Sequence, residues 1–416
     1  MSDNQNTVKP LHLSTYDRGG AAVASLRLHH EFLRQGLPST YLVGHKTTQL
    51  ETVEVATDVM GSIEQKWFQR VYKKNFILDK QARRTGAIKW SDNRRWHTLP
   101  LRLNQSNANI IHLNWLGDGL LPIGMMRFIN KPMVWTMHDS WAYTGGCHVP
   151  LDCHRYQTAC GQCPQLQSDN HLDRSHDSYK LKQSTWHRLN LIVVCPSEWL
   201  AERFRQSDMF KSHRIEVIPN GLDLAQFKVH AKNDARRQLH VDPDRKYILF
   251  GAVSINDRNK GGDLLAHALI HLQLQDNVTI LLLGKEQDEF VFPDSIGVKR
   301  LGYISDQTQL NHIYAASDVC VVPSRQENLN NTIMEALASG TPAVAFDVGG
   351  NRELIAHLKH GYLAQPYQPE ELAYGISWCI NNTEKIVDNA RNYVEANYDI
   401  HKIATRYWDL YQQILS

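Results

Sequence analysis

The sequence contains no long hydrophobic run. Nowhere in its 416 residues do about eighteen apolar residues follow one another, which is the length that a membrane-spanning helix needs. The first fifteen residues also lack the basic start and the apolar core of a secretory signal. These absences argue against an integral helical membrane protein and against an exported one, and we expect a cytoplasmic protein.

Cysteines are few and odd in number. Seven of them in a long chain without an export signal do not make a disulfide framework, so reduced thiols or a metal site are the better interpretations. Low-complexity tracts are also absent, and 42% hydrophobic and 21% charged residues are ordinary values for a globular protein. Because this length exceeds what one hydrophobic core usually serves, we expect two domains of about 200 residues each.

The chain as a whole lacks an excess of charge of either sign, since its formal net charge is only +2. The two halves differ, however. Residues 1–190 contain 23 Lys and Arg against 15 Asp and Glu, whereas residues 191–416 contain 22 against 28. The basic first half indicates an anionic partner, either a phosphorylated acceptor or an acidic bilayer surface.

Short apolar runs rich in β-branched residues alternate with longer polar stretches that leave room for crossover helices. This is the βαβ pattern of parallel sheets. The sequence therefore predicts an α/β fold with two doubly wound sheets. The runs are residues 110–113, 133–137, 191–194, 247–250, 278–283, 319–322 and 343–346.

The predicted domain boundary follows residue 218, because Pro219, Asn220 and Gly221 stop regular structure there. We assign residues 1–218 to a first domain, with a cysteine-containing insertion at 145–165, and residues 219–395 to a second. Residues 396–416 carry apolar side chains at helical spacing. That helix must dock on another part of the protein.

Two glycines, Gly19 and Gly20, lie between a predicted strand at residues 8–14 and a helical pattern. Glycine lets the backbone approach a phosphate at a helix N-terminus, where unpaired N–H groups and the helix dipole favour an anion. An ordinary strand-to-helix turn has the same sequence, since the pair lacks the spacing of a full nucleotide fingerprint.

Further candidates follow the strands of the first half. His138 and Asp139 end the strand at 133–137, and Asn114 and Trp115 follow the strand at 110–113. The carboxyl ends of parallel strands are where open α/β sheets hold ligands. His138 could hydrogen-bond a sugar hydroxyl, or it could only satisfy the backbone at a strand end. We expect Asn114, Trp115 and Asp139 on the acceptor side of a site.

In the second half, Arg258 and Lys260 lie on a glycine-bearing loop that leads into an apolar helix. Two cations at a helix start can neutralise a pyrophosphate, and solvated loop charges are the alternative. The segment 323–342 predicts a polar loop and then a short helix, with Glu327 on the loop and Glu335 in the first helical turn. Thr332 and Glu335 fit a capping box, which explains Glu335 but not Glu327.

Glu327 and Glu335 resemble the paired-glutamate signature of retaining GT-B glycosyltransferases. The surrounding motifs, in their order from residue 11 to about 400, are similar to those of glycosyltransferase family 4. The resemblance implies two Rossmann-like domains facing a cleft, with the terminal helix crossing back to the first domain. The other motifs that carry it are Gly19-Gly20, His138-Asp139, Ile218-Pro219-Asn220-Gly221-Leu222-Asp223, Lys260-Gly261 and Glu335-Ala-Leu-Ala-Ser-Gly-Thr-Pro342.

The resemblance also implies an activity. A sugar would pass from a UDP- or GDP-sugar to a glycan or lipid-linked oligosaccharide in exopolysaccharide synthesis, with retention of configuration and no metal cofactor in catalysis. Glu327 would bind hydroxyls of the donor sugar, Glu335 the ribose and Lys260 the diphosphate. The backbone groups implied to bind the diphosphate with Lys260 are those of Leu329, Asn330, Asn331 and Thr332.

For the first domain, the resemblance implies that His138 lines the donor-sugar pocket near the reacting carbon and that Gly19 and Gly20 approach the phosphates. Members of the family usually carry an arginine directly after the strand at 247–250, where this chain has Gly251, Ala252 and Val253. Arg258 is the candidate replacement.

Four cysteines could supply thiolates to a structural zinc ion, with His148 and His154 as replacements; buried, idle thiols are the alternative. A paired Cys-x-x-Cys occurs only once among them. Family members that build colanic acid carry a similar insertion, which implies a non-catalytic part that shapes the acceptor side. The cysteines are Cys147, Cys153, Cys160 and Cys163.

Residues 66–102 contain eleven Lys and Arg but only two Asp, interleaved with six aromatic residues. Such a stretch could lie on an anionic membrane, grip a phosphorylated acceptor, form a nucleic-acid groove or be a solvated helix face over core aromatics. The resemblance to lipid-linked glycan assembly favours the membrane surface and no nucleic acid.

Two other functions compete with a glycosyltransferase. A GT-B-fold epimerase would share the nucleotide site but turn over its nucleotide sugar without an acceptor. A non-catalytic binding module would tolerate the loss of Glu327, which this chain retains.

Overall fold

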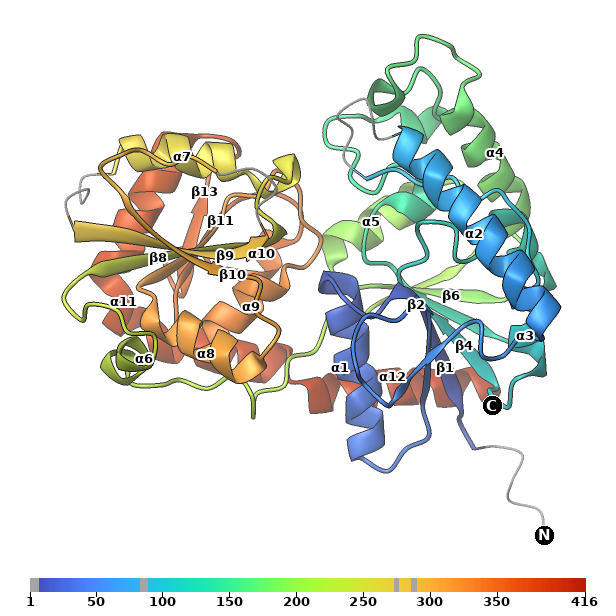
Figure 1. Cartoon of the computed structure of the whole chain (residues 1–416), viewed down its shortest axis with the longest axis horizontal. Coiled ribbons are helices and arrows are strands. Elements are labelled where there is room, and N and C mark those ends of the chain that lie inside the picture. Colours follow the sequence, from blue (N-terminus) through green and yellow to red (C-terminus); the bar gives the residue numbers. More distant parts are fainter. Residues whose placement is uncertain (1–6, 83–88, 273–276, 286–289) are drawn as a thin grey trace. The chain divides into compact units, whose positions relative to one another are not determined.

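The computed structural model describes residues 7–82, 89–272, 277–285 and 290–416, and of residues 75–82 and 384–385 the backbone alone. The chain divides into two compact units (Figure 1). Residues 1–219 and 402–416 form the first, and residues 220–401 form the second. Among the described residues, no helix is long and apolar enough to cross a membrane.

The first unit is built on one parallel seven-stranded sheet with the order β3-β2-β1-β4-β5-β6-β7. Its strands are β1 Pro10–Tyr16, β2 Thr40–His45, β3 Val53–Val55, β4 Ile110–Leu113, β5 Met133–Thr136, β6 Leu191–Cys195 and β7 Arg214–Val217. Its helices are α1 Gly20–Arg34, α2 Ser62–Ala82, α3 Leu99–Gln105, α4 Arg174–Trp186, α5 Glu198–Gln206 and α12 Ile400–Leu415. The first strand begins two residues later than expected, because Pro10 starts its pairing with β4.

The second unit is built on a parallel six-stranded sheet with the order β10-β9-β8-β11-β12-β13. Its strands are β8 Lys246–Ser254, β9 Val278–Lys285, β10 Gly297–Gly302, β11 Val319–Val322, β12 Ala343–Phe346 and β13 Gly361–Ala364. Its helices are α6 Lys232–Gln238, α7 Gly262–Ile270, α8 Gln307–Ala316, α9 Asn331–Ala338, α10 Asn351–Leu354 and α11 Pro369–Asn397. Two doubly wound parallel sheets confirm the predicted fold class.

Both faces of each sheet are buried, which explains the continuous apolar runs in the sequence. Alternate residues of one strand enter different cores: Leu249 packs on one side of the second sheet, and Ile248 and Phe250 pack on the other. The same alternation divides the first sheet, where Leu113 and Ile110 face opposite cores.

The helix α12 closes one face of the first sheet, as predicted. Its residues Ile403, Tyr407 and Tyr411 pack with Val134 of β5 and Phe32 of α1 in one core. The helix begins at Ile400 rather than at residue 396, because α11 continues to Asn397. Tyr398 and Asp399, between the two helices, are not helical.

This non-helical segment forms backbone hydrogen bonds with Leu222. The N–H of Leu222 donates to the carbonyl of Tyr398 at 2.7 Å, and the N–H of Ile400 donates to the carbonyl of Leu222 at 3.0 Å. The segment after the domain boundary therefore pairs with the segment that leads into α12. Gly221 allows this approach, since a Cβ there would lie 2.3 Å from a side-chain carbon of Ile400.

His112 takes part in the polar contacts under α12. Its Nδ1 shares a 2.5 Å hydrogen bond with the hydroxyl of Tyr411, and its Nε2 lies 2.7 Å from the hydroxyl of Thr136. Burial, with a smaller contribution from the charge of His138, lowers the pKa of His112 to about 3 from an ordinary 6.5. The imidazole is therefore neutral in the folded protein at neutral pH.

We expect the protein to lose stability as the pH falls from 6.5 toward 3, because the unfolded chain binds a proton at His112 that the folded chain does not. The stability is fully present above pH 6.5. A buried histidine with a lowered pKa reduces the free energy of unfolding by up to about 1.4 kcal/mol for each unit by which the pH falls. Urea denaturation at pH 7 and pH 5 measures the slope; His112→Asn should flatten it, and a change at exposed His401, His401→Gln, should not.

Candidate active site

Each sheet reverses its winding direction between two neighbouring strands. In the first unit the reversal lies between β1 and β4, and in the second between β8 and β11. The helical crossovers leave such a point in opposite directions, so the carboxyl ends of its two strands stay accessible to a ligand. The predicted candidates follow these strands or the strand next to them.

The structure brings Lys260 and Glu327 together. The Nζ of Lys260 lies 2.7 Å from Oε1 of Glu327, and their side chains are 31% and 12% exposed. Burial lowers the pKa of Lys260, but the charge of Glu327 and its hydrogen bond outweigh burial, with a further contribution from Asp257, so this pKa lies above its ordinary value. Lys260 is a permanent cation next to a carboxylate that is mostly shielded from water.

Sequence reasoning missed the residues that join the two loops. The side chain of Asn259 donates to the carbonyl of Gln326 at 2.9 Å, and its oxygen accepts from the N–H of Gln326 at 3.1 Å. Arg325 donates to the carbonyl of Arg258 at 2.6 Å and pairs with Asp263 through two hydrogen bonds. These contacts fix the backbone on both sides of the Lys260–Glu327 pair. In the sequence, the only indication of these contacts is that both segments are polar.

Two glycines allow the loops to approach so closely. Gly261 has φ +69°, and a Cβ there would lie 1.9 Å from the carbonyl oxygen of Pro323. Gly349 has φ +60°, and a Cβ there would lie 1.7 Å from the carbonyl oxygen of Glu327. Any larger residue at either position would push the Glu327 loop away.

The cap of α9 differs from the expected capping box. The side chain of Asn330 accepts from the N–H of Thr332 at 2.8 Å and of Ile333 at 3.4 Å, so the N-cap is Asn330 and not Thr332. Asparagine at this position satisfies two of the N–H groups that a helix start leaves unpaired. Glu335 consequently lies in the second turn and not in the first.

Glu335 has a partner from another helix instead. Its Oε2 accepts the hydroxyl of Tyr314, in α8, at 2.7 Å, and the residue is only 8% exposed. Burial, followed by the charge of Glu335, raises the pKa of Tyr314 well above its ordinary value, so the phenol remains a hydrogen-bond donor. Tyr314 is thus the residue that positions this carboxylate.

The remaining donor-side candidates surround the start of α9. Leu329 is buried, and the side-chain oxygen of Asn331 accepts from Nδ2 of Asn220 at 3.3 Å. Arg258 is exposed on the loop after β8. Within the second unit, the structure therefore gathers a cation, a carboxylate and a helix N-terminus at the reversal of the sheet.

In the first unit, Gly19 is the N-cap of α1 and has φ +89°, a conformation that favours glycine, and Gly20 begins the helix. Asp17 fixes the preceding turn, because its carboxylate accepts hydrogen bonds of 2.7–2.9 Å from the backbone and hydroxyls of Thr47 and Thr48. Burial raises the pKa of Asp17, but these bonds outweigh it and the pKa is lowered.

Asn114, Trp115, His138 and Asp139 line one pocket of the first unit. They come from the ends of the neighbouring strands β4 and β5. Gly19 and Gly20 are not among the residues that line it. Burial lowers the pKa of His138 to about 4, against the opposing charge of Asp139, so His138 is neutral at neutral pH and offers hydrogen bonds rather than charge.

Asp139 forms hydrogen bonds with residues that line this pocket. Its Oδ2 accepts from Nε1 of Trp115 at 2.7 Å and lies 2.6 Å from Nδ1 of His148, while its Oδ1 accepts from the N–H of Trp141 at 2.8 Å. Trp115 and His148 stack with their ring centroids 5.1 Å apart. Asp139 therefore positions the aromatic wall, a function that its place in the sequence did not reveal.

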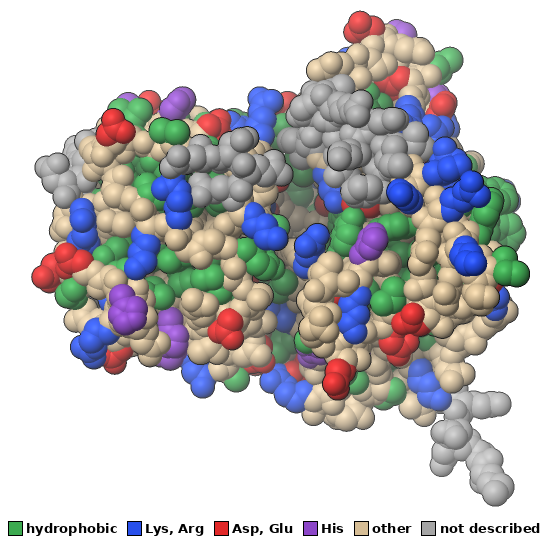
Figure 2. Space-filling model, viewed as in Figure 1, with side chains coloured by type: hydrophobic (Ala, Val, Ile, Leu, Met, Phe, Trp, Pro, Cys, Tyr) green, Lys and Arg blue, Asp and Glu red, His purple; other side chains and the backbone are tan. Residues whose placement is uncertain are grey.

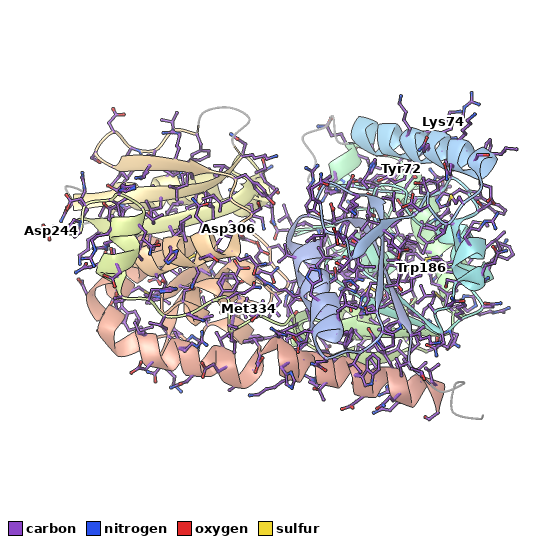
Figure 3. The ribbon with its side chains drawn as sticks, turned by 60° about the horizontal axis from the view of Figure 1, so that its bottom comes forward. Tyr72, Lys74, Trp186, Asp244, Asp306 and Met334 are labelled. Atoms are coloured by element: carbon purple, nitrogen blue, oxygen red, sulfur yellow. The ribbon has the colours of Figure 1, made fainter. Side chains whose placement is uncertain are left out.

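The basic aromatic stretch 66–102 divides between core and surface. Phe68, Tyr72 and Trp90 are buried, whereas Trp67 and Trp96 are 53% and 56% exposed. In Figure 3, Tyr72 points into the unit and Lys74 points away from it. The side chains of residues 75–88 lie outside the described part of this stretch.

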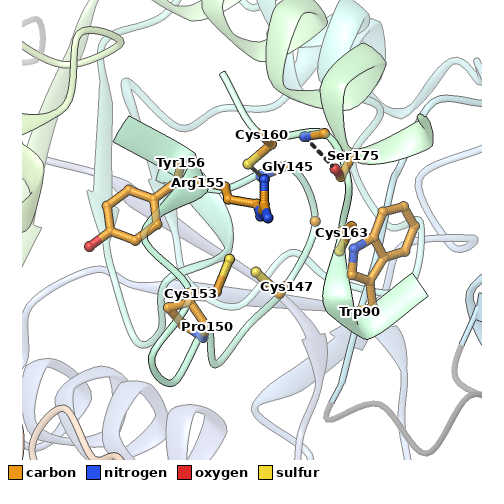
Figure 4. Close-up of a pocket in the computed structure, with 12 residues that line it drawn as sticks. Trp90, Gly145, Cys147, Pro150, Cys153, Arg155, Tyr156, Cys160, Cys163 and Ser175 are labelled. Atoms are coloured by element: carbon orange, nitrogen blue, oxygen red, sulfur yellow. Dashed lines mark hydrogen bonds between the residues drawn. The ribbon is translucent and has the colours of Figure 1, made fainter. Parts of the chain in front are cut away.

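The four cysteines of the insertion come together. Cys147, Cys153, Cys160 and Cys163 line one small pocket of the first unit (Figure 4). All seven cysteines of the chain are free thiols in the structure.

Two family models match the chain. The model described as Glycosyltransferase Family 4 matches residues 18–226, and the model described as Glycosyl transferases group 1 matches residues 245–382. Together they cover every strand except β1 and all the candidate residues, and the first of the two alone matches half of the chain.

Two curated proteins illustrate the similarity. A putative colanic acid biosynthesis glycosyl transferase, WcaC of Escherichia coli strain K12, is 24% identical over 351 residues, which is 81% of this chain and 82% of that protein. An uncharacterized glycosyltransferase of Methanocaldococcus jannaschii is 28% identical over 280 residues, which is 64% of this chain and 70% of that protein.

Solved structures share the fold. Sucrose-phosphate synthase from Thermosynechococcus elongatus has a TM-score of 0.68 at 20% identity, covering 98% of this chain and 99% of that one. HepE of Anabaena, in complex with UDP and glucose, has a TM-score of 0.67 at 19% identity, covering 97% and 99%. The fold is GT-B, and the chain belongs to glycosyltransferase family 4.

Proposed function

We propose that this glycosyltransferase moves a sugar from a nucleotide-diphosphate sugar to a glycan or lipid-linked oligosaccharide in exopolysaccharide synthesis, with retention of configuration and no metal cofactor in catalysis. The observation that carries the proposal is the Lys260–Glu327 pair beside the N-terminus of α9. One site there offers a cation and the positive end of a helix dipole to a diphosphate, and a carboxylate to sugar hydroxyls.

The reaction needs little covalent chemistry from the protein. The bond between the anomeric carbon and the phosphate oxygen breaks, and the acceptor oxygen bonds to the same carbon. Lys260 and the N-terminus of α9 stabilise the charge that develops on the departing diphosphate. We assign the acceptor proton to a phosphate oxygen of the leaving group, which permits attack on the same face of the sugar.

Glu327 is assigned to binding rather than to nucleophilic attack. Retention usually requires a carboxylate nucleophile at the anomeric carbon. The carboxylate of Glu327 is held by Lys260 at 2.7 Å, which suits an acceptor of hydroxyl hydrogen bonds. His138, neutral because its pKa is about 4, is assigned to a hydroxyl of the same sugar. Arg258 is assigned to the diphosphate.

The identity of the nucleotide is the first point to test. HepE was crystallised with UDP and with UDP-glucose, so UDP-sugars head the screen and GDP-sugars follow. Release of nucleoside diphosphate by the purified protein, with and without lipid-linked acceptors, identifies the donor. Turnover without an acceptor and without hydrolysis would support an epimerase, and binding without turnover a binding module.

We expect Glu327→Gln to lower kcat/KM by about 10²–10³-fold, because it removes the sugar-binding charge. Binding of the nucleoside diphosphate alone, measured by calorimetry, should stay within about threefold of wild type, since that ligand lacks the sugar that is transferred. The matched control is Glu370→Gln at an exposed position of α11, which should leave both quantities unchanged. Equal losses of diphosphate and donor binding would contradict the assignment.

We expect Glu335→Gln to weaken nucleoside diphosphate binding by about tenfold, because a charged acceptor of the ribose hydroxyls becomes neutral. Tyr314→Phe should produce a smaller loss. The discriminating measurement compares the nucleotide with its 2′,3′-dideoxy analogue: wild type should prefer the natural ribose, and Glu335→Gln should lose most of that preference. An unchanged preference would leave Glu335 a structural residue only.

We also propose that α2 lies on an anionic membrane surface when the acceptor is lipid-linked. Figure 2 shows Lys and Arg side chains along the region of α2, with hydrophobic side chains beside them. Ile63 and Trp67 on this helix are 84% and 53% exposed. A basic helix that presents an exposed tryptophan is suited to the interface of acidic lipids.

Sedimentation with vesicles tests this surface. We expect the protein to pellet with vesicles that contain phosphatidylglycerol and not with pure phosphatidylcholine, and we expect added salt to release it. Trp67→Ala should weaken the binding several-fold, and Tyr374→Ala, a change at an exposed aromatic residue of the second unit, should not. Equal binding to both kinds of vesicle would rule out the electrostatic part of the proposal.

A further inference from the structure

The insertion that follows Tyr143 contains little regular structure. Between Gly145 and Asp173 only two short turns of 3₁₀-helix occur, η4 Arg155–Thr158 and η5 Pro164–Leu166. Non-glycine residues with left-handed backbone concentrate in this segment, and such conformations persist only where the surroundings impose them. They are Leu151, Ala159, Cys160, Gln162 and Gln167, with φ between 44° and 82°. A loop of this length needs an internal cross-link or a core of its own.

The four cysteines lie where a cross-link would act. They line one pocket, surrounding it from several sides (Figure 4). They come from four different points of the insertion, so a single ion bound among them would tie the whole segment together. Trp90 closes the same pocket from a distant part of the chain.

A backbone N–H group is directed at one of the sulfur atoms. The N–H of Gly145 donates to Sγ of Cys160 at 3.2 Å. The N–H of Leu166, in the turn after Cys163, donates to the carbonyl oxygen of that cysteine at 3.1 Å. Hydrogen bonds to a ligating sulfur orient it and stabilise it once a metal is bound.

A buried lysine beside the insertion also suits an anionic cluster. Lys182 of α4 is fully buried, and its ammonium group donates to the carbonyls of Trp141 and Thr144 at 2.5 and 3.0 Å. Burial lowers the pKa of Lys182 to about 7, against smaller opposing contributions from Cys147, Cys160 and two carboxylates. A metal bound by four thiolates carries net negative charge, which the ammonium group of Lys182 would offset.

We propose that Cys147, Cys153, Cys160 and Cys163 bind one zinc ion through four thiolates. His148, considered as a replacement ligand from the sequence, does not fit, because its ring nitrogens already contact Asp139 at 2.6 Å and Ser91 at 3.0 Å. Among the described residues, no three His, Cys, Asp or Glu side chains are already arranged to hold a metal. Binding therefore requires the thiol side chains to rotate into the pocket that they line and to release their protons to solvent.

The ion would stabilise more than the insertion. Cys147 directly precedes His148, and His148 holds Asp139 against Trp115 in the pocket of the first unit. Zinc at Cys147 would therefore fix one wall of the candidate site. Fixing this wall is a structural role of the zinc ion. Any effect of zinc on the rate of sugar transfer rests on the proposed function.

Metal analysis of the purified full-length protein tests the site. From cells grown with zinc we expect about one zinc ion per chain by mass spectrometry, which is the content of a single four-cysteine site. Cys153→Ser and Cys160→Ser should each lower the content at least several-fold. The matched control is Cys379→Ala, a buried cysteine of the second unit, which should keep the metal. A wild-type protein with almost no zinc would overturn the proposal.

A second measurement does not depend on how the variants fold. We expect Co²⁺, added to the chelator-treated wild-type protein, to give thiolate-to-metal charge-transfer bands and intense visible bands of tetrahedral cobalt. Absence of these bands, with equal reactivity of the thiols before and after zinc is added, would refute the site. Bound zinc in a protein that turns over no donor would support the metal site and contradict the proposed function.

Discussion

The reversal of winding in the middle of each parallel sheet is the constraint on which the candidate site depends. Parallel strands require crossover helices, and these helices cover both faces of the sheets, so only the strand ends remain for binding. At β8 and β11 the crossovers diverge, and the loops that follow these strands meet. Every donor-side candidate of the second unit lies on one of these two loops or on the first two turns of α9.

Within that framework, the site is held by polar contacts between loops that are distant in the sequence. Asn259 and Arg325 connect the loop after β8 with the loop after β11, and Gly261 and Gly349 remove the side chains that would separate them. Lys260 and Glu327 are thereby held in place before any ligand binds. A site arranged in advance loses little free energy to reorganisation when charge develops.

The sequence predicted the parts of this architecture that depend on local patterns. Apolar runs located the strands, and glycines and prolines located the turns. The predicted N-cap of α9, Thr332, was wrong. Thr332 and Asn330 both suit an N-cap, and only the helix geometry decides between them. The link from Glu335 to Tyr314 could not be predicted, because a hydrogen bond between residues of different helices leaves no periodic signal. The network around Asp139 escaped prediction for the same reason.

The position of α12 has a consequence for how the protein is made. Tyr407 and Tyr411 pack on the face of the first sheet beside Phe32 and Val134, although the whole second unit separates them from these residues in the sequence. During synthesis, the amino-terminal sheet therefore emerges from the ribosome with an apolar face uncovered, and it stays uncovered until α12 has left the exit tunnel. The first unit therefore begins to fold early but completes its core only after the second unit has been synthesised. Until then, its apolar face is a surface to which a chaperone can bind.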